Sequence, residues 1–109
     1  MVVVLFGTNM RADADLDEYA SRSQRMNELM REIPGCICVK DYASEGGDEV
    51  SIARFESEEA LKDWRLQPEH VETQKRARWA YYESYWVHVC RTVRDYQFSR
   101  ERGLVHNPI

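Results

Sequence analysis

Three side chains could carry chemistry on a small organic molecule, namely Asn9, Trp64 and His70. An asparagine amide donates hydrogen bonds to an oxyanion or a peroxide-like oxygen, and a tryptophan ring stacks on a flat molecule. A histidine removes a phenolic proton near neutral pH or ligates iron. Each residue stands near the end of an expected helix or strand, where sites are commonly assembled.

Each of the three residues also has a purely structural interpretation. Asn9 could bridge the amides of a turn, and Trp64 fits a hydrophobic core. His70 lies in the first turn after Pro68, which suits a solvated helix end. The residue types allow both kinds of role.

A second group of candidates lies in the last expected strand. His88 stands between Trp86 and Cys90 on one strand face, because alternate side chains of a strand point the same way. It fits either a second site or a hydrogen-bonded histidine at a subunit interface. The strand start carries an aromatic cluster made of Tyr81, Tyr82 and Tyr85. That cluster could receive an aromatic ligand or pack at a subunit boundary.

The three cysteines are Cys36, Cys38 and Cys90. The C-x-C pair, in an extended run, should point both thiols to one face, and its spacing is neither the CxxC redox motif nor a zinc knuckle. Buried, reduced thiols are one interpretation. A metal site that adds a histidine is the other.

Several common chemistries lack their motifs. We find no glycine-rich phosphate loop, nucleophile elbow, HExxH or well-placed carboxylate pair. Phosphoryl transfer, serine hydrolysis and zinc proteolysis therefore have no support.

The composition indicates one globular domain. The 109 residues are 43% hydrophobic, which supports a packed core. Fifteen basic and nineteen acidic residues give a net charge of -4, which argues against nucleic-acid or anionic-membrane partners. The run VVVLF is too short for a signal or a membrane span, so we expect a cytoplasmic protein.

Hydrophobic periodicity and breakers predict the order strand, helix, strand, strand, helix, strand. The expected elements are a strand from residue 2 to about 9, a helix over 16–33 capped by Asp13 or Asp15, strands at 36–42 and 50–55, a helix starting at Ser57 and reopening at Pro68 to about Tyr82, and a strand over 84–93. The domain is expected to span residues 1–98, followed by a polar, loosely attached tail over 99–109.

This order predicts an α+β, ferredoxin-like βαββαβ fold, a four-stranded antiparallel sheet with two helices on one face. The opposite face stays bare, although the first and last strands are apolar on both of their sides. Burying apolar surface is favourable by roughly 25 cal/mol per Å². We therefore expect a homodimer that packs sheet face to sheet face, with a cavity between the helices and the sheet of each subunit.

With these elements in place, the chain resembles the antibiotic biosynthesis monooxygenase superfamily of dimeric α+β barrel proteins. The segments that carry the likeness, within residues 1–98, are VVVLFGTN, IPGCICVKDY, EVSIARFES leading into EEALKDW, PEHVETQ and YYESYWVHVCRTVRDY. The resemblance implies a pocket in each subunit that oxidises aromatic or polycyclic substrates. The resemblance also implies a reaction that often needs no metal or flavin, because the substrate itself activates dioxygen.

A haem-degrading branch of the superfamily uses an asparagine on the first strand, a tryptophan on the second helix and a histidine ten residues later. Asn9 and Trp64 match the first two, but Gln74 stands at the third position. His70 lies four residues before Gln74, which is about one helical turn or roughly 5.4 Å along the axis. Haem degradation therefore ranks below cofactor-free oxidation.

The leading hypothesis is a cofactor-independent monooxygenase that acts on a small aromatic or quinol-type substrate and dioxygen. In it Asn9 polarises oxygen, Trp64 stacks on the substrate and His70 is the base, and we expect no cofactor and no metal. The alternatives are a non-catalytic dimer that binds a small ligand and, ranked lower, a haem-binding or haem-degrading relative.

Overall fold

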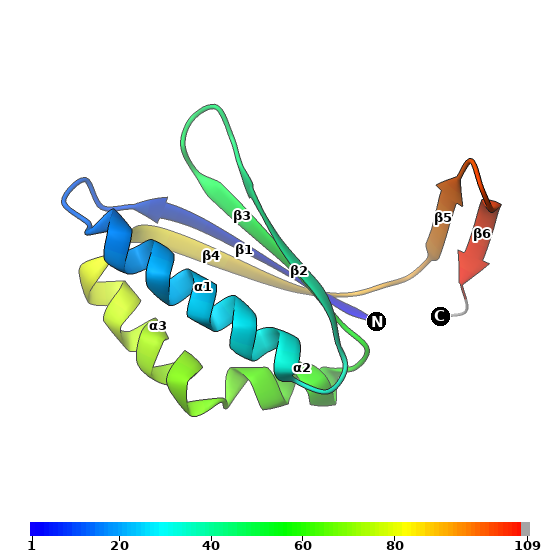
Figure 1. Ribbon diagram of the computed structural model, residues 1–109, viewed down its shortest axis with the longest axis horizontal. Coiled ribbons are helices and arrows are strands. Elements are labelled where there is room, and N and C mark those ends of the chain that lie inside the picture. Colours follow the sequence, from blue (N-terminus) through cyan, green and yellow to red (C-terminus); the bar gives the residue numbers. More distant parts are fainter. Residues whose placement is uncertain (108–109) are drawn as a thin grey trace.

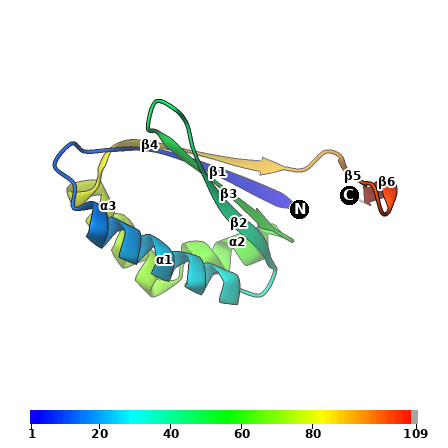
Figure 2. The same cartoon turned by 45° about the horizontal axis from the view of Figure 1, so that its top comes forward.

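Four antiparallel strands form the main sheet of the computed structural model, which describes residues 1–107. The sheet order is β2-β3-β1-β4, and three helices lie on one of its faces (Figures 1 and 2). The elements are β1 (Val2–Met10), α1 (Leu16–Glu32), β2 (Cys36–Ala43), β3 (Glu49–Phe55), α2 (Glu58–Arg65), α3 (Pro68–Ala80), β4 (Tyr82–Arg91), β5 (Asp95–Ser99) and β6 (Gly103–Asn107). The predicted ferredoxin-like α+β fold is confirmed.

Polar side chains define where the helices begin. Asp15, one of the two predicted caps, accepts a hydrogen bond from the Glu18 amide at 3.0 Å, and Ser57 does the same for Ala60 at 3.2 Å. The first helix ends at Glu32, just before the predicted Pro34–Gly35 stop, where Gly35 takes a positive φ of 89°.

The end of the chain differs from the expected boundaries. Helix α3 stops at Ala80, and β4 already begins at Tyr82, which pairs with Met10 beyond an irregularity in the β1–β4 pairing. Residues 95–107 form a hairpin that starts before the expected boundary at residue 98. The turn of this hairpin uses Gly103, whose φ is +69°. The hairpin stands away from the main sheet and the helices (Figures 1 and 2).

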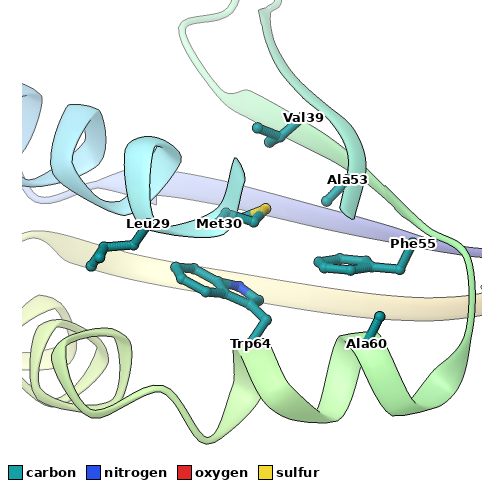
Figure 3. Packing of buried hydrophobic residues seen from close by; sticks show 7 residues of the cluster. All are labelled: Leu29, Met30, Val39, Ala53, Phe55, Ala60 and Trp64. Carbon is teal, nitrogen blue, oxygen red and sulfur yellow. The ribbon is translucent and has the colours of Figure 1, made fainter. Parts of the chain in front are cut away.

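The hydrophobic core lies at the end of the sheet where β1 begins. Phe55 is fully buried there, and the α2 residue Trp64 is only 6% exposed. Figure 3 shows the cluster, which consists of Leu29, Met30, Val39, Ala53, Phe55, Ala60 and Trp64. Antiparallel pairing of Val2 with Phe55 brings the first residue of β1 to this cluster.

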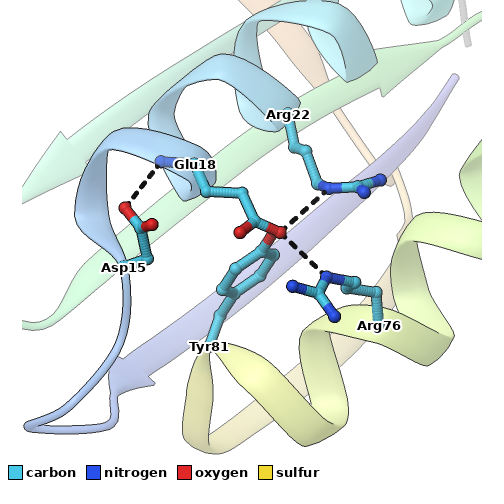
Figure 4. A network of polar contacts seen from close by, with 5 residues as sticks. All are labelled: Asp15, Glu18, Arg22, Arg76 and Tyr81. Carbon is cyan, nitrogen blue, oxygen red and sulfur yellow. Dashed lines mark hydrogen bonds and ion pairs between the residues drawn. The ribbon is translucent and has the colours of Figure 1, made fainter.

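A polar network joins the start of α1 to the end of α3 (Figure 4). Arg76 Nε donates to Glu18 Oε1 at 2.8 Å, and the buried Tyr81 donates its phenolic proton to the same oxygen. The hydrogen bond from Arg76, followed by that from Tyr81, lowers the pKa of Glu18 to about 2. The charged carboxylate is thus the form that holds the two helices together.

We expect Glu18→Gln to lower the free energy of unfolding near neutral pH. The folded-state pKa of Glu18 lies below its ordinary value of 4.5, so its contribution is present above pH 4.5 and is lost as pH falls toward about 2. Urea denaturation across this range should therefore show a shallower acid dependence in the variant. Asp17→Asn, at an exposed site in the same turn, is the matched control. Parallel pH profiles for Glu18→Gln and the wild type would contradict the assignment.

The other face of the main sheet carries no helix among the residues described (Figure 2). Trp86 lies on this open face and covers Gly7, where a Cβ would meet the indole at 2.1 to 2.4 Å. The indole remains 42% exposed, and His88 is tilted against it with ring centroids 4.7 Å apart. An aromatic, partly exposed surface therefore occupies the centre of the open face.

Candidate functional site

Trp64 and His70 form a stacked pair at the break between α2 and α3. Their ring centroids are 4.0 Å apart and their planes differ by 19°. The break places them together because α3 restarts at Pro68, with the Gln67 side chain accepting a hydrogen bond from the His70 amide at 2.7 Å. Proline at the first position of a helix loses no hydrogen bond, so the restart costs little.

The tautomer of His70 follows from its backbone contact. Nδ1 lies 3.1 Å from the carbonyl oxygen of Trp64, which can only accept a hydrogen bond, so Nδ1 carries the proton. In the neutral ring Nε2 then keeps its lone pair. Burial lowers the pKa of His70 and outweighs the opposing effect of the bond to Trp64. A neutral imidazole with a basic Nε2 is therefore the form present near neutral pH.

The indole of Trp64 supports His70 and the core at once. One neighbour is the imidazole, and the others are apolar side chains such as Phe55 and Leu29 (Figure 3). The core interpretation of Trp64 therefore holds. Its contact with a partly exposed imidazole adds a second role, because the stack limits the orientations that the ring of His70 can adopt.

Asn9 lies apart from this pair. It is exposed near the far end of β1, and its Nδ2 donates to Ser84 Oγ at 3.2 Å. The core end of β1 is at Val2, seven residues away, which corresponds to roughly 23 Å along a strand. Alternation along β1 also turns Asn9 to the open face, since Val2 points to the helices. The structure thus brings Trp64 and His70 together, but not Asn9.

The tyrosine cluster does form, beside the start of β4. Phe6 packs edge-on against Tyr82 and Tyr85, with ring centroids 5.9 and 5.5 Å apart. Burial raises the pKa of Tyr82, so its phenol stays protonated. Tyr81 instead contacts Tyr19 at 5.4 Å and belongs to the Glu18 network.

A shallow hollow of about 220 Å³ opens next to this cluster. Arg78 Nε donates to the Tyr85 hydroxyl at 2.9 Å, and its guanidinium lies 6.0 Å from the centre of the same ring. The hollow is lined by Arg78, Tyr82, Glu83, Ser84 and Tyr85. A cation beside aromatic rings suits an aromatic anion. The hydrogen bond from Asn9 to Ser84 links Asn9 to this hollow rather than to His70.

The cysteines do not share a face. An irregularity in β2 lets Cys36 pair with Phe55 and Cys38 pair with Arg54, and these adjacent β3 residues point to opposite sides of the sheet. Burial raises the pKa of Cys36, which favours the protonated thiol. Within residues 1–107, no three His, Cys, Asp or Glu side chains gather in a way that could hold a metal ion. The expectation of two thiols on one face was therefore wrong.

Comparison with known proteins matches the chain to one sequence family. The sequence model described as antibiotic biosynthesis monooxygenase matches residues 1–76. The uncharacterized protein YqjZ of Bacillus subtilis is 29% identical over 81 residues, which are 74% of this chain and 71% of YqjZ. None of the helices in the described part of the chain is long and apolar enough to cross a membrane.

Two solved structures show how widely the fold is shared. Rv0793 of Mycobacterium tuberculosis superposes with a TM-score of 0.75 at 24% identity, covering 84% of this chain and 94% of its own. SnoaB of Streptomyces nogalater, a cofactor-independent oxygenase, gives 0.72 at 14% identity over 84% and 92% of the two chains. At these identities the superpositions establish the fold alone.

Proposed function

The chain belongs to the antibiotic biosynthesis monooxygenase family, and on that premise we propose that it oxidises a small aromatic or quinol-type substrate with dioxygen, without a cofactor. The observation that carries the proposal is the neutral, partly buried His70, whose Nε2 is basic while Nδ1 is held by Trp64. The likeness to a cofactor-independent oxygenase supports the same class of reaction.

The proposed chemistry begins with proton transfer from a phenolic hydroxyl to His70 Nε2. The resulting phenolate is electron-rich and reduces dioxygen. A phenol with a free ring position gains one oxygen atom and becomes a quinone, while the second oxygen atom leaves as water with the two hydrogens that the phenol loses. His70 returns its proton to the developing water, and Trp64 orients the imidazole throughout.

Asn9 receives no role beside His70 in this proposal. Its amide is bonded to Ser84 on the open face of the sheet, so it would not reach an oxygen bound near His70 of the same chain. The open face itself supports the proposed homodimer, in which two sheets pack face to face and bury Trp86.

Oxygen uptake tests the proposal directly. Purified protein is incubated with a panel of hydroquinones and polycyclic phenols, and uptake is compared between the wild type, His70→Ala and Asn9→Ala. We expect uptake with at least one phenol, its loss in His70→Ala and its retention in Asn9→Ala. Uptake that is equal in all three proteins, or absent across the panel, would refute the proposal.

A second candidate is ligand binding without turnover at the hollow beside Tyr85. The guanidinium of Arg78 lies over the ring of Tyr85, which favours binding of an aromatic anion. His70 does not line this hollow, so binding there would involve no proton transfer to the imidazole. Native mass spectrometry with naphthoate should then detect a complex that Arg78→Ala weakens. A complex that His70→Ala weakens instead would favour the first candidate.

A further inference from the structure

The C-terminal hairpin has one apolar face. In the register of β5 and β6, Tyr96 lies opposite His106, and Phe98 lies opposite Leu104. Alternation puts these four side chains on one side, while Gln97 and Val105 lie on the other. Tyr96, Phe98 and Leu104 are 54%, 68% and 59% exposed. The hairpin thus presents an aromatic and aliphatic surface to solvent.

Within the described residues, no strand of the main sheet pairs with this hairpin. It forms its own two-stranded sheet, beyond the end of β4 (Figures 1 and 2). An isolated two-stranded hairpin is at best marginally stable in water and requires packing against another layer. A partner for its apolar face is therefore needed.

The connection from β4 to the hairpin favours a partner outside the chain. The main ladder continues one residue past β4, where the Thr92 amide donates to the Met1 carbonyl at 3.0 Å. Only Val93 and Arg94 then remain before β5 begins, and Val93 is 87% exposed. This short connection contains neither glycine nor proline, the residues that most readily reverse a chain. The hairpin therefore extends away from its own sheet.

We propose that the hairpin of residues 95–107 is an exchanged arm that packs its apolar face on a second copy of this chain. The inference rests on the proposed sheet-face dimer and extends it. In a dimer with twofold symmetry, the arm of each copy packs on the equivalent surface of the other copy. The same contact therefore forms twice, and each time it covers the apolar face of one arm and an exposed surface of the partner copy.

The area of the open face supports a second copy as the occupant. Four strands about 4.8 Å apart, with about eight residues at about 3.3 Å each, give a face of roughly 500 Å², or roughly 1,000 Å² over two copies. Stable interfaces bury about 1,200–2,000 Å² in total. The sheet faces alone thus fall short of a stable dimer. Two arms, each adding three large exposed side chains, provide the additional contact.

Sedimentation velocity over a range of concentrations tests the arm with matched variants. The full chain should sediment as a dimer, near twice its mass of 12.9 kDa. Phe98→Asp should raise the dimer dissociation constant at least tenfold, because it places a charge in the contact twice per dimer. Gln97→Asp introduces the same charge on the opposite face of β5 and should leave the constant within about twofold of wild type.

The outcomes separate the arm from the dimer. A dimer that Phe98→Asp and Gln97→Asp weaken equally would overturn the arm while leaving the sheet-face dimer intact. A monomeric full chain would overturn both, and oxygen uptake would still test the oxidation independently.

Contacts between copies can be observed directly. Dimers mixed from isotope-labelled and unlabelled chains should show NMR contacts from the Phe98 and Leu104 side chains to the other copy. Contacts confined to one chain would show that the hairpin folds back on its own subunit. Contacts only with a foreign protein in the sample would show that this protein, and not a second copy of the chain, is the partner of the hairpin. Either result would overturn the proposal.

Discussion

His70→Ala is expected to slow oxidation of the best phenolic substrate by about 10²–10⁴-fold, the range typical of a lost general base. The variant removes Nε2, the nitrogen whose lone pair is kept free by the bond between Nδ1 and the Trp64 carbonyl. Steady-state kinetics should show the loss in kcat rather than in KM, because the proton is transferred in the transition state.

The pH profile gives this prediction a second readout. Burial lowers the pKa of His70 below 6.5, so the basic form persists as pH falls below 6.5 and the acid limb of kcat/KM should lie below that value. Gln74→Ala, one helical turn further along α3, is the control and should keep both the rate and the profile. A wild-type rate in His70→Ala, or an unchanged acid limb, would remove His70 as the base.

Trp64→Ala is expected to destabilise the protein by about 3–5 kcal/mol, as for other buried tryptophans that are truncated to alanine. Trp64 is 6% exposed and lies in the core cluster with Phe55. Truncation to alanine therefore leaves a cavity in the hydrophobic core of the described residues. Small domains are stable by about 5–15 kcal/mol, so the loss is a large fraction of the total. Urea denaturation followed by far-UV circular dichroism measures it.

Two further variants separate packing from chemistry. Trp79→Ala removes a tryptophan that is 81% exposed on α3 and should change stability by about 0.5 kcal/mol or less. Trp64→Phe should keep most of the stability but contact the imidazole of His70 over a smaller ring. A loss of stability in Trp79→Ala that matches Trp64→Ala would contradict the assigned core.

Most of the main fold could be predicted because its elements carry strong local signals. Proline and glycine at residues 34–35 follow the end of α1 at Glu32, Ser57 caps α2, and Pro68 reopens the helix, all as expected. The strand order follows from right-handed connections. The C-terminal hairpin could not be predicted in the same way, because strands of five residues leave a weak periodic signal and a single glycine, Gly103, marks the turn.

The candidate site was harder to predict. Each candidate residue stands near the end of a helix or strand, but this alone does not say at which end of the sheet the residue lies. Phe55 leads directly into α2, so Trp64 lies where β3 ends. Antiparallel pairing puts the start of β1 there, at Val2, and sends Asn9 to the opposite end. This separation could have been deduced from the strand order. The irregularity that turns Cys36 and Cys38 to opposite faces could not, since alternation alone carries no sign of it.

The three indoles occupy three different environments, so the fluorescence emission of tryptophan reports on both assembly and unfolding. Trp64 is enclosed, Trp79 is almost fully hydrated, and Trp86 lies over Gly7 at intermediate exposure. Association through the open face would remove water from Trp86 alone, so a blue shift of its emission follows assembly. Unfolding instead exposes Trp64 and shifts emission to the red. Dilution and denaturation can therefore be told apart from intrinsic fluorescence, without an attached dye.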